Sequence, residues 1–341
     1  MAKCVAPEES GWTFCPNLLA AILFTVLYGL CIFTHLLLAI RTRKKFCWVI
    51  IMGSAWLTVG FALRAKAADH ISGIGDFIPQ SIIIFLGPLW LNGFVYMVMG
   101  RMVHMLLKRD QLYRISARRL TLIFVILDII AFFVQASSSG PMASDDRDTA
   151  EMGSYIMMAG VAIQQAFITF FAILAARFHY KLLLGARYTP SYSLEQNHLV
   201  SSSPSNTTHE RDDNAIVKPA FYTVPWRRLL YALYITLILI TIRNIFRLIE
   251  FSDGVHGYIA THEAFFYSLD ALPIFAGLIV LAVVHPSCVL DGPDSEFPPR
   301  EKKSKKGKES GGRRRRRRSR GKGVEGGESE VDEHRRGVAQ V

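Results

Sequence analysis

The sequence predicts an all-α membrane protein, a bundle of seven transmembrane helices. Three observations predict this fold: long apolar runs, loops between them that alternate in charge, and a positive charge excess confined to one stretch of the chain. The 341 residues are 51% apolar and 20% charged, whereas soluble domains usually carry about 25% charge. The apolar residues gather into runs of the length that a bilayer requires, roughly 20 residues.

Seven such runs account for nearly half of the chain. The predicted spans are residues 18–40, 46–63, 80–105, 120–136, 155–176, 229–250 and 264–284. The first run is too long for a secretory signal peptide, whose apolar core has about 7–15 residues. Because the basic stretch Arg41–Lys45 follows this run directly, we interpret it as a retained helix.

The loops alternate in charge as the positive-inside rule requires. Arg41–Lys45 carries four basic residues and Lys108–Arg119 carries five. On the other side, residues 136–154 carry four acidic residues and one basic residue, and residues 251–263 contain no Lys or Arg. This alternation predicts a short extracellular N-terminus, residues 1–17, and a cytosolic C-terminus.

Two polar segments are predicted on the cytosolic side, a flexible loop at residues 186–224 and a disordered polybasic tail at residues 288–341. Residues 300–322 hold 14 Lys or Arg and two acidic residues, so the net charge of +11 belongs to this tail and the rest of the chain sums to −1. We therefore predict no nucleic-acid partner. The tail either attracts anionic inner-leaflet lipids or is a solvated segment that adds positive-inside charge.

The five cysteines lack paired CxxC spacing, which excludes a zinc ribbon. Cys4 and Cys15 fall on the predicted outer side, where they either pair or stay reduced. Cys288 follows the last span at a position compatible with palmitoylation. The sequon at Asn206 lies on the cytosolic side of the predicted topology and is interpreted as unused.

Ionisable residues inside the spans are the most informative, because each costs roughly 2.5–3.5 kcal/mol at the centre of a membrane helix. Asp128 lies midway along the fourth span, and Arg243, Arg247 and Glu250 share one face of the sixth. By helix rise, Arg243 and Asp270 of the seventh span fall at the same depth, roughly 10 Å below the outer surface. We expect these charges to face the interior and neutralise one another.

The interior charges have two interpretations, which the residues alone leave near balance. One is a polar pocket in the outer half of the bundle that holds a charged or zwitterionic head group. The other is an ion-pair network that fixes helix register without binding a substrate. Further polar residues near the outer ends of the spans favour the pocket slightly. They are Gln80, Gln135, Gln164 and His262.

The motifs of several enzyme classes are missing from the sequence. It contains no H-x-x-x-H box, no G-x-S-x-G, no Walker A and no H-E-x-x-H. His262 and His285 lie at opposite ends of the seventh span, about 30 Å apart by helix rise, and cannot share a metal ion. That span also has no Lys for a retinal Schiff base. We therefore predict no enzyme activity, no cofactor and no metal.

The polar residues resemble, in type and order, those of the fungal RTA-like family, lipid-translocating exporters named for resistance to an aminocholesterol. The matching positions are Ile242–Glu250, Gly254, Gly257, His262, Glu263, Tyr267, Asp270, Ala271, His285 and Pro286. Further matches are Gln80, Pro88, Tyr96, Gly100, Arg101, Asp128, Gln135, Met142, Ala143, Ala159, Gly160 and Gln164. The sequence departs from the family pattern at Leu57, where a Glu is usual, and at Ser137–Ser139, which replaces a glycine cluster.

The resemblance implies a multi-pass protein of the plasma membrane that translocates or exports amphipathic lipids, such as a sphingoid base or a phospholipid, and confers resistance to toxic amphiphiles. Its partners would be membrane lipids. Candidate substrate-binding residues are Asp128, Gln135, Arg243, Arg247, Glu250, His262, Glu263 and Asp270, supported by Gln80, Tyr96, Gln164 and Tyr267. The alternative is a seven-helix sensor that regulates a lipid or stress response without transport. The lipid, the direction and the oligomeric state are left open.

Overall fold

The computed structural model describes residues 16–69, 74–108, 111–112, 115–144, 146–188, 217–218, 224–254 and 257–291. The chain divides into two units, Met1–Phe297 and Pro298–Val341, and all described residues belong to the first. Cys4, Cys15, Asn206 and the basic stretch of the tail lie outside the described residues, as does most of the predicted loop at 186–224.

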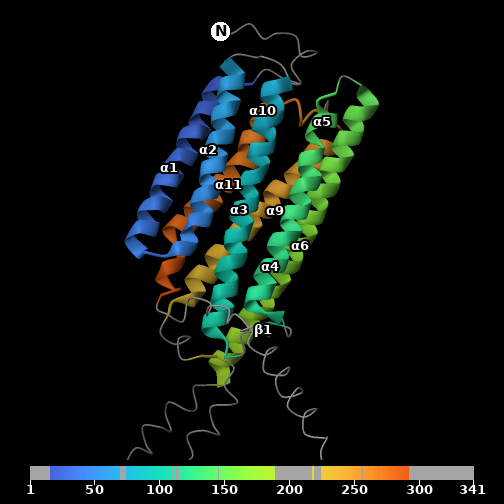
Figure 1. Cartoon of the computed structure of the whole chain (residues 1–341). Helices are drawn as coiled ribbons and strands as arrows, with labels where there is room; N and C mark the ends of the chain where they lie inside the picture. The colour runs from blue at the N-terminus through green and yellow to red at the C-terminus, as the bar shows by residue number, and fades with distance from the viewer. Residues whose placement is uncertain are drawn as a thin grey trace, which may run out of the picture. The chain divides into compact units, whose positions relative to one another are not determined.

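Seven helices of the described residues are long and apolar enough to cross a membrane, which confirms the predicted fold class (Figure 1). The spans are Leu18–Thr42, Lys45–Asp69, Phe77–Leu106, Ala117–Met142, Arg147–Gly185, Trp226–Ser252 and Glu263–Cys288. They are built from α1 (Leu18–Thr42), η2 (Lys45–Cys47), α2 (Trp48–Asp69), α3 (Ile74–Leu106), α4 (Ala117–Ser137), α5 (Ser139–Met142), α6 (Arg147–Tyr188) and α9 (Trp226–Ser252). The seventh span combines α10 (Glu263–Phe265), the π-helical turn η4 (Phe266–Ala271), α11 (Leu272–Val283) and η5 (Pro286–Cys288).

The ends of α1 show how local sequence sets the helix boundaries. Asn17 is the N-cap, and its side-chain oxygen accepts a hydrogen bond from the Ala20 amide. Arg43 ends the helix in the left-handed conformation, with φ of 54°, and the next span begins at Lys45. The tight turn places α1 and α2 side by side and antiparallel (Figure 1).

Small residues allow close approach of the helices in the bundle. A Cβ atom added at Gly60 of α2 would lie 2.7 Å from Cγ1 of Ile84 in α3. One added at Gly160 of α6 would lie 2.7 Å from Cγ of Gln135 in α4. At both positions the partner helix occupies the space that a side chain would need.

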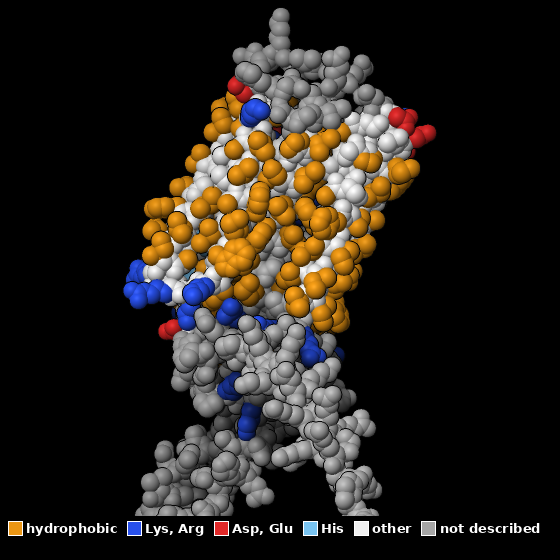
Figure 2. Space-filling view, viewed as in Figure 1, with side chains coloured by type: hydrophobic (Ala, Val, Ile, Leu, Met, Phe, Trp, Pro, Cys, Tyr) orange, Lys and Arg blue, Asp and Glu red, His pale blue; other side chains and the backbone are white. Residues whose placement is uncertain are grey.

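Large apolar side chains cover the outside of the bundle, as expected of a surface that faces lipid. Leu19 is 77% exposed and Phe133 is 66% exposed, which would be unfavourable in water. Figure 2 shows this apolar surface, with Lys and Arg side chains gathered near the end where α1 finishes. We call that end the Thr42 end of the bundle and the opposite one the Leu18 end.

Two segments differ from the sequence-based expectation. Helix α2 continues through Arg64 and Lys66 to Asp69, whereas the apolar run predicts an end near residue 63. The difference arises because charged side chains lower the hydropathy before the helix itself ends. Within the predicted flexible loop, Val217 and Lys218 have a defined place: Val217 is buried and bridges to Leu107, and the Lys218 amide donates to the carbonyl of Leu106. A two-residue strand pair, β1 (Gln111–Leu112) and β2 (Ile115–Ser116), connects α3 to α4.

Candidate functional site

The seventh span carries a π-helical turn, η4, in the half of the bundle near the Leu18 end. Such turns bond each amide to the carbonyl five residues earlier and occur frequently at functional sites. Asp270 and Tyr267 both lie in this turn and are buried. The hydroxyl of Tyr28 in α1 donates to the carbonyl of Ala271 at 2.8 Å, so α1 is joined to the same turn.

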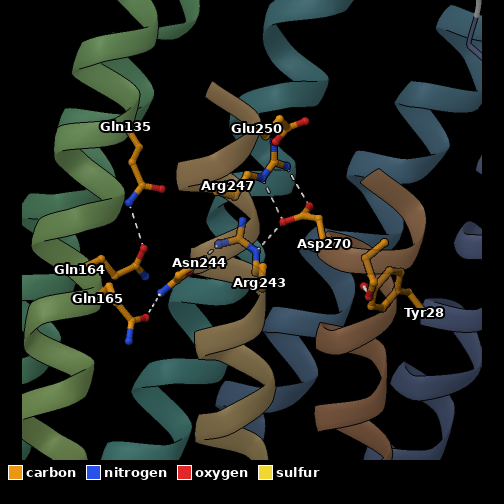
Figure 3. Close-up of polar contacts among 10 residues, drawn as sticks. Tyr28, Gln135, Gln164, Gln165, Arg243, Asn244, Arg247, Glu250 and Asp270 are labelled. Atoms are coloured by element: carbon orange, nitrogen blue, oxygen red, sulfur yellow. Dashed lines mark hydrogen bonds and ion pairs between the residues drawn. The ribbon is translucent and has the colours of Figure 1, made fainter. Parts of the chain in front are cut away.

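Asp270 is the centre of a buried cluster of four charged side chains, shown in Figure 3. Arg247 of α9 binds its carboxylate through two hydrogen bonds, Nε to Oδ1 at 3.0 Å and Nη2 to Oδ2 at 2.8 Å. Nε of Arg243 lies 2.7 Å from Oδ1, an ion pair outside hydrogen-bond geometry. Nη1 of Arg247 also donates to Glu250 at 2.9 Å. We call these four residues the charge quartet.

The charge quartet balances two guanidinium groups against two carboxylates. All four side chains are buried, with Arg243 at 2% exposure and Glu250, the most accessible, at 8%. Left unpaired in the membrane, four charges would cost roughly 10 kcal/mol on insertion scales. The quartet therefore gives the interior strong polarity with no formal net charge.

Amide side chains extend the polar group from α9 towards α6 and α4 (Figure 3). Nη1 of Arg243 donates to Asn244 at 3.2 Å, and Nδ2 of Asn244 donates to Gln165 of α6 at 3.0 Å. Nearby, Nε2 of Gln135 in α4 donates to Oε1 of Gln164 at 2.9 Å. The amides can rearrange their hydrogen bonds, since each both donates and accepts.

A second ion pair lies closer to the Leu18 end. Nη2 of Arg64 in α2 binds Glu263 at 2.8 Å, and its Nε donates to the hydroxyl of Tyr267 at 3.2 Å. The guanidinium carbon also lies 4.4 Å from the centroid of the Phe266 ring, a cation–π distance. Oε2 of Glu263 accepts a hydrogen bond from the backbone amide of Asn17 at 2.6 Å. This pair joins α1, α2 and the seventh span.

Asp128 of α4 belongs to neither ion-pair group. Its Oδ2 accepts from Nδ2 of Asn92 at 2.9 Å and from the hydroxyl of Tyr96 at 3.0 Å, both on α3. Of the ion pairs found in the described residues, none includes Asp128. The expectation that the interior charges neutralise one another holds for the charge quartet and fails for this residue.

The remaining predicted residues divide by burial. Gln80 is buried on α3, and its Nε2 donates to Ser81. His262 is exposed, and its ring lies 4.1 Å from that of Tyr258, outside the charge quartet. His262 is the N-cap residue of α10, and its side chain makes no capping hydrogen bond.

The chain matches the family model described as RTA1 like protein over residues 50–293. A probable lipid transporter of Emericella nidulans, atnI, is 34% identical over 88% of this chain and 76% of its own. The chain belongs to the RTA1-like family. The match begins inside the second span, covers the five spans that follow, and includes the charge quartet.

Other relatives of this RTA1-like chain come from Saccharomyces cerevisiae. One is the protoporphyrin uptake protein 1, 28% identical over 66% of this chain and 63% of its own. Another is the sphingoid long-chain base transporter RSB1, 24% identical over 83% of this chain and 75% of its own. No solved structure matches the chain.

Several residues of the RTA1-like interior were absent from the predicted site. They are Tyr28, Arg64, Asn92, Gln165 and Asn244. Arg64 lies one residue beyond the predicted second span, residues 46–63, where a basic residue is expected in a loop and not inside the bundle. The neutral residues carry no functional signal of their own in a single sequence, because Asn and Gln also form hydrogen bonds between membrane helices and Tyr is enriched at membrane interfaces.

Proposed function

We propose that this RTA1-like chain translocates amphipathic lipids across the plasma membrane. One observation carries the proposal, the buried charge quartet in a chain whose relatives are named as lipid and sphingoid base transporters. Ionisable residues within membrane spans are costly and mark substrate pathways. The site holds two guanidinium groups and two carboxylates, all of them buried.

The proposed binding site is the charge quartet with the amide pairs beside it. A sphingoid base presents an ammonium group and hydroxyls, and a phospholipid adds a phosphate. The ammonium group of a lipid can replace Arg247 as the partner of Glu250. A lipid phosphate can bind the planar guanidinium group of Arg247 through two hydrogen bonds. Hydroxyls can exchange hydrogen bonds with Gln135 and Gln164. Because the site has partners of both signs, it suits zwitterionic and cationic head groups.

The second ion pair, Arg64 with Glu263, would close the route between the charge quartet and the Leu18 end. Tyr267 joins the two groups, since it lies in the same π-helical turn as Asp270 and accepts from Arg64. A head group that moves past this point must separate Arg64 from Glu263 or pass beside them. His262, exposed near Glu263, would be among the first side chains that it meets.

The proposed orientation puts the N-terminus outside and the C-terminus in the cytosol. Arg41, Arg43, Lys44 and Lys45 all belong to the Thr42 end, which the positive-inside rule assigns to the cytosol. The basic tail would then face anionic inner-leaflet lipids. In this orientation the charge quartet lies in the outer half of the membrane, roughly 10 Å from the outer surface by helix rise.

The deciding experiment measures movement of a labelled sphingoid base and of a labelled phospholipid across liposomes that contain only the purified protein. We expect movement with the wild type, a loss of at least tenfold in Arg247→Gln, and no change in Gly29→Ala, where an added methyl group meets nothing within 4 Å. No movement of either lipid by folded wild-type protein would overturn the proposal and favour the sensor.

A further inference from the structure

Asp128 is a buried carboxylate that the proposed head-group site does not use. It is 1% exposed, and its neighbours on α3, Asn92 and Tyr96, are equally buried. Both neighbours donate to the same oxygen, Oδ2. The other oxygen, Oδ1, has no hydrogen-bond partner although it is buried.

On the described helices that pack against α4, no positively charged residue lies near the level of Asp128 to balance an ionised carboxylate. On α3, which packs against α4, the sole titratable residue between Asp76 and Arg101 is Tyr96. On α6, the other long helix packed against α4, no titratable residue occurs between Tyr155 and Arg177. The short neighbours α5 and β2 contain none. Arg101 is directed elsewhere, with its guanidinium carbon 4.6 Å from the Phe46 ring centroid.

Aromatic rings close the site on the side towards the Thr42 end. The ring centroid of Tyr96 lies 4.5 Å from that of Phe171 and 5.4 Å from that of Phe124, one turn before Asp128 on α4. Phe124 and Phe171 are each 1% exposed. Such packing excludes water, so an ionised Asp128 would have neither a counter-ion nor hydration. In that situation a carboxyl group takes up a proton and becomes neutral.

We propose that Asp128 is a proton-binding site, with the proton on Oδ1 in the conformation of this structure. Here α3 packs against α4, and we call this conformation closed. This inference deepens the proposed function by coupling proton binding to lipid translocation. Only the coupling rests on the proposed function; the proton site itself does not. Oδ2 remains the acceptor for Asn92 and Tyr96, so protonation costs no hydrogen bond. Protonation forms one O–H bond and removes one negative charge, with the proton taken from water.

The linkage follows from the environment that Asp128 would meet if the helices moved apart. An aspartate in water is ionised at neutral pH. A conformational change that separates α3 from α4 and hydrates Asp128 would therefore release one proton. By thermodynamic linkage, acid then favours the closed conformation and release of the proton accompanies opening. A proton gradient across the membrane could in this way bias the direction of lipid movement.

Infrared spectroscopy of the folded protein in lipid nanodiscs tests the proton site without any transport. At pH 7 we expect the carbonyl stretching band of a protonated carboxylic acid, shifted in D₂O and abolished by denaturation. The band should be absent in Asp128→Asn and retained in the matched control Glu250→Gln, which removes a buried carboxylate already paired with Arg247. A wild-type spectrum without this band overturns the proposal. This test uses the wild-type protein alone, so it stands even if Asp128→Asn fails to fold.

A second arm distinguishes a proton from an ammonium group as the occupant. If the wild type lacks the band while Asp128→Asn loses binding of sphingosine at least tenfold, Asp128 is ionised and pairs with the amine, which overturns the proton assignment.

In liposomes, a pH-sensitive dye in the lumen should report proton movement together with labelled lipid in the wild type. It should report no proton movement in Asp128→Asn. A protonated Asp128 in a protein that moves no lipid would leave the proton site standing and refute the proposed function.

Discussion

Arg247 and Asp270 are joined by two parallel hydrogen bonds, at 3.0 and 2.8 Å, that connect α9 to the π-helical turn of the seventh span. Arg243 shares the same carboxylate. One aspartate therefore serves two arginines, while Glu250 completes the charge balance through Arg247. The arrangement makes Asp270 the shared partner of both arginines.

Replacing Asp270 by Asn should destabilise the protein severely, because it leaves two buried guanidinium groups with one carboxylate. Removing one partner of a buried ion pair costs about 3–5 kcal/mol. Thermal unfolding in detergent measures the loss. Glu250→Gln is the comparison, and we expect a smaller effect because Glu250 binds only Arg247 in the described network and is the most accessible member. Equal melting temperatures for wild type and Asp270→Asn would contradict this account.

The pair of Arg64 and Glu263 should show strong energetic coupling. Their side chains are 5% and 10% exposed, and coupling energies of residues in contact run from about 0.5 to 3 kcal/mol. A double-mutant cycle with Arg64→Gln and Glu263→Gln measures the coupling from unfolding free energies. The exposed pair of Arg147 and Glu151, at 82% and 46% exposure, is the control and should give less than about 0.5 kcal/mol. Similar coupling in both cycles would show that burial does not strengthen the inner pair.

Hydropathy and loop charge were sufficient to predict the seven spans, because the requirement to cross a bilayer acts on whole segments. Helix rise alone also placed Arg243 level with Asp270, and the ion pair at 2.7 Å confirms it. The contact between Asp270 and Arg247 was harder to predict from the sequence. A π-helical turn changes the direction in which the following side chains point, and it has no recognisable signal in one sequence.

Contacts between residues far apart in sequence account for most of what the sequence could not show. Arg64 and Glu263 are separated by 199 positions, and nothing local to either residue indicates the other. Asp128 shows a different limit. Its burial was predictable from its place in an apolar span. Whether its carboxyl group binds an arginine or neutral hydrogen-bond donors depends on which face of α3 meets α4, and this is not visible in the sequence.

Gly160→Val should separate α4 from α6 and break the bond between Gln135 and Gln164. An added Cβ would lie 2.7 Å from Cγ of Gln135 and 3.1 Å from its backbone nitrogen, and overpacking of this kind costs about 1–3 kcal/mol. The measurements are unfolding in detergent and lipid movement in liposomes. Gly29→Val is the matched control, since its Cβ would meet nothing within 4 Å. A stable and active Gly160→Val protein would show that the two helices can move apart freely.

Asp146 caps the start of α6 and should make that helix end sensitive to acid. Its Oδ2 accepts from the hydroxyl and the amide of Thr149, and these hydrogen bonds lower the pKa of Asp146. A lowered pKa means that the cap stabilises the folded state above the ordinary pKa of aspartate and is lost as the pH falls through the folded value. Hydrogen exchange at the Thr149 amide, corrected for its intrinsic pH dependence, should therefore show protection that declines in acid.

The variants of Asp146 separate capping from charge. Asp146→Ala should remove the protection at every pH, because alanine offers no acceptor. Asp146→Asn keeps an acceptor oxygen that does not titrate, so it should retain protection with no decline in acid. If wild type and Asp146→Asn lost protection at the same pH, the acid sensitivity would arise elsewhere, and the carboxylate of Asp146 would not be its source.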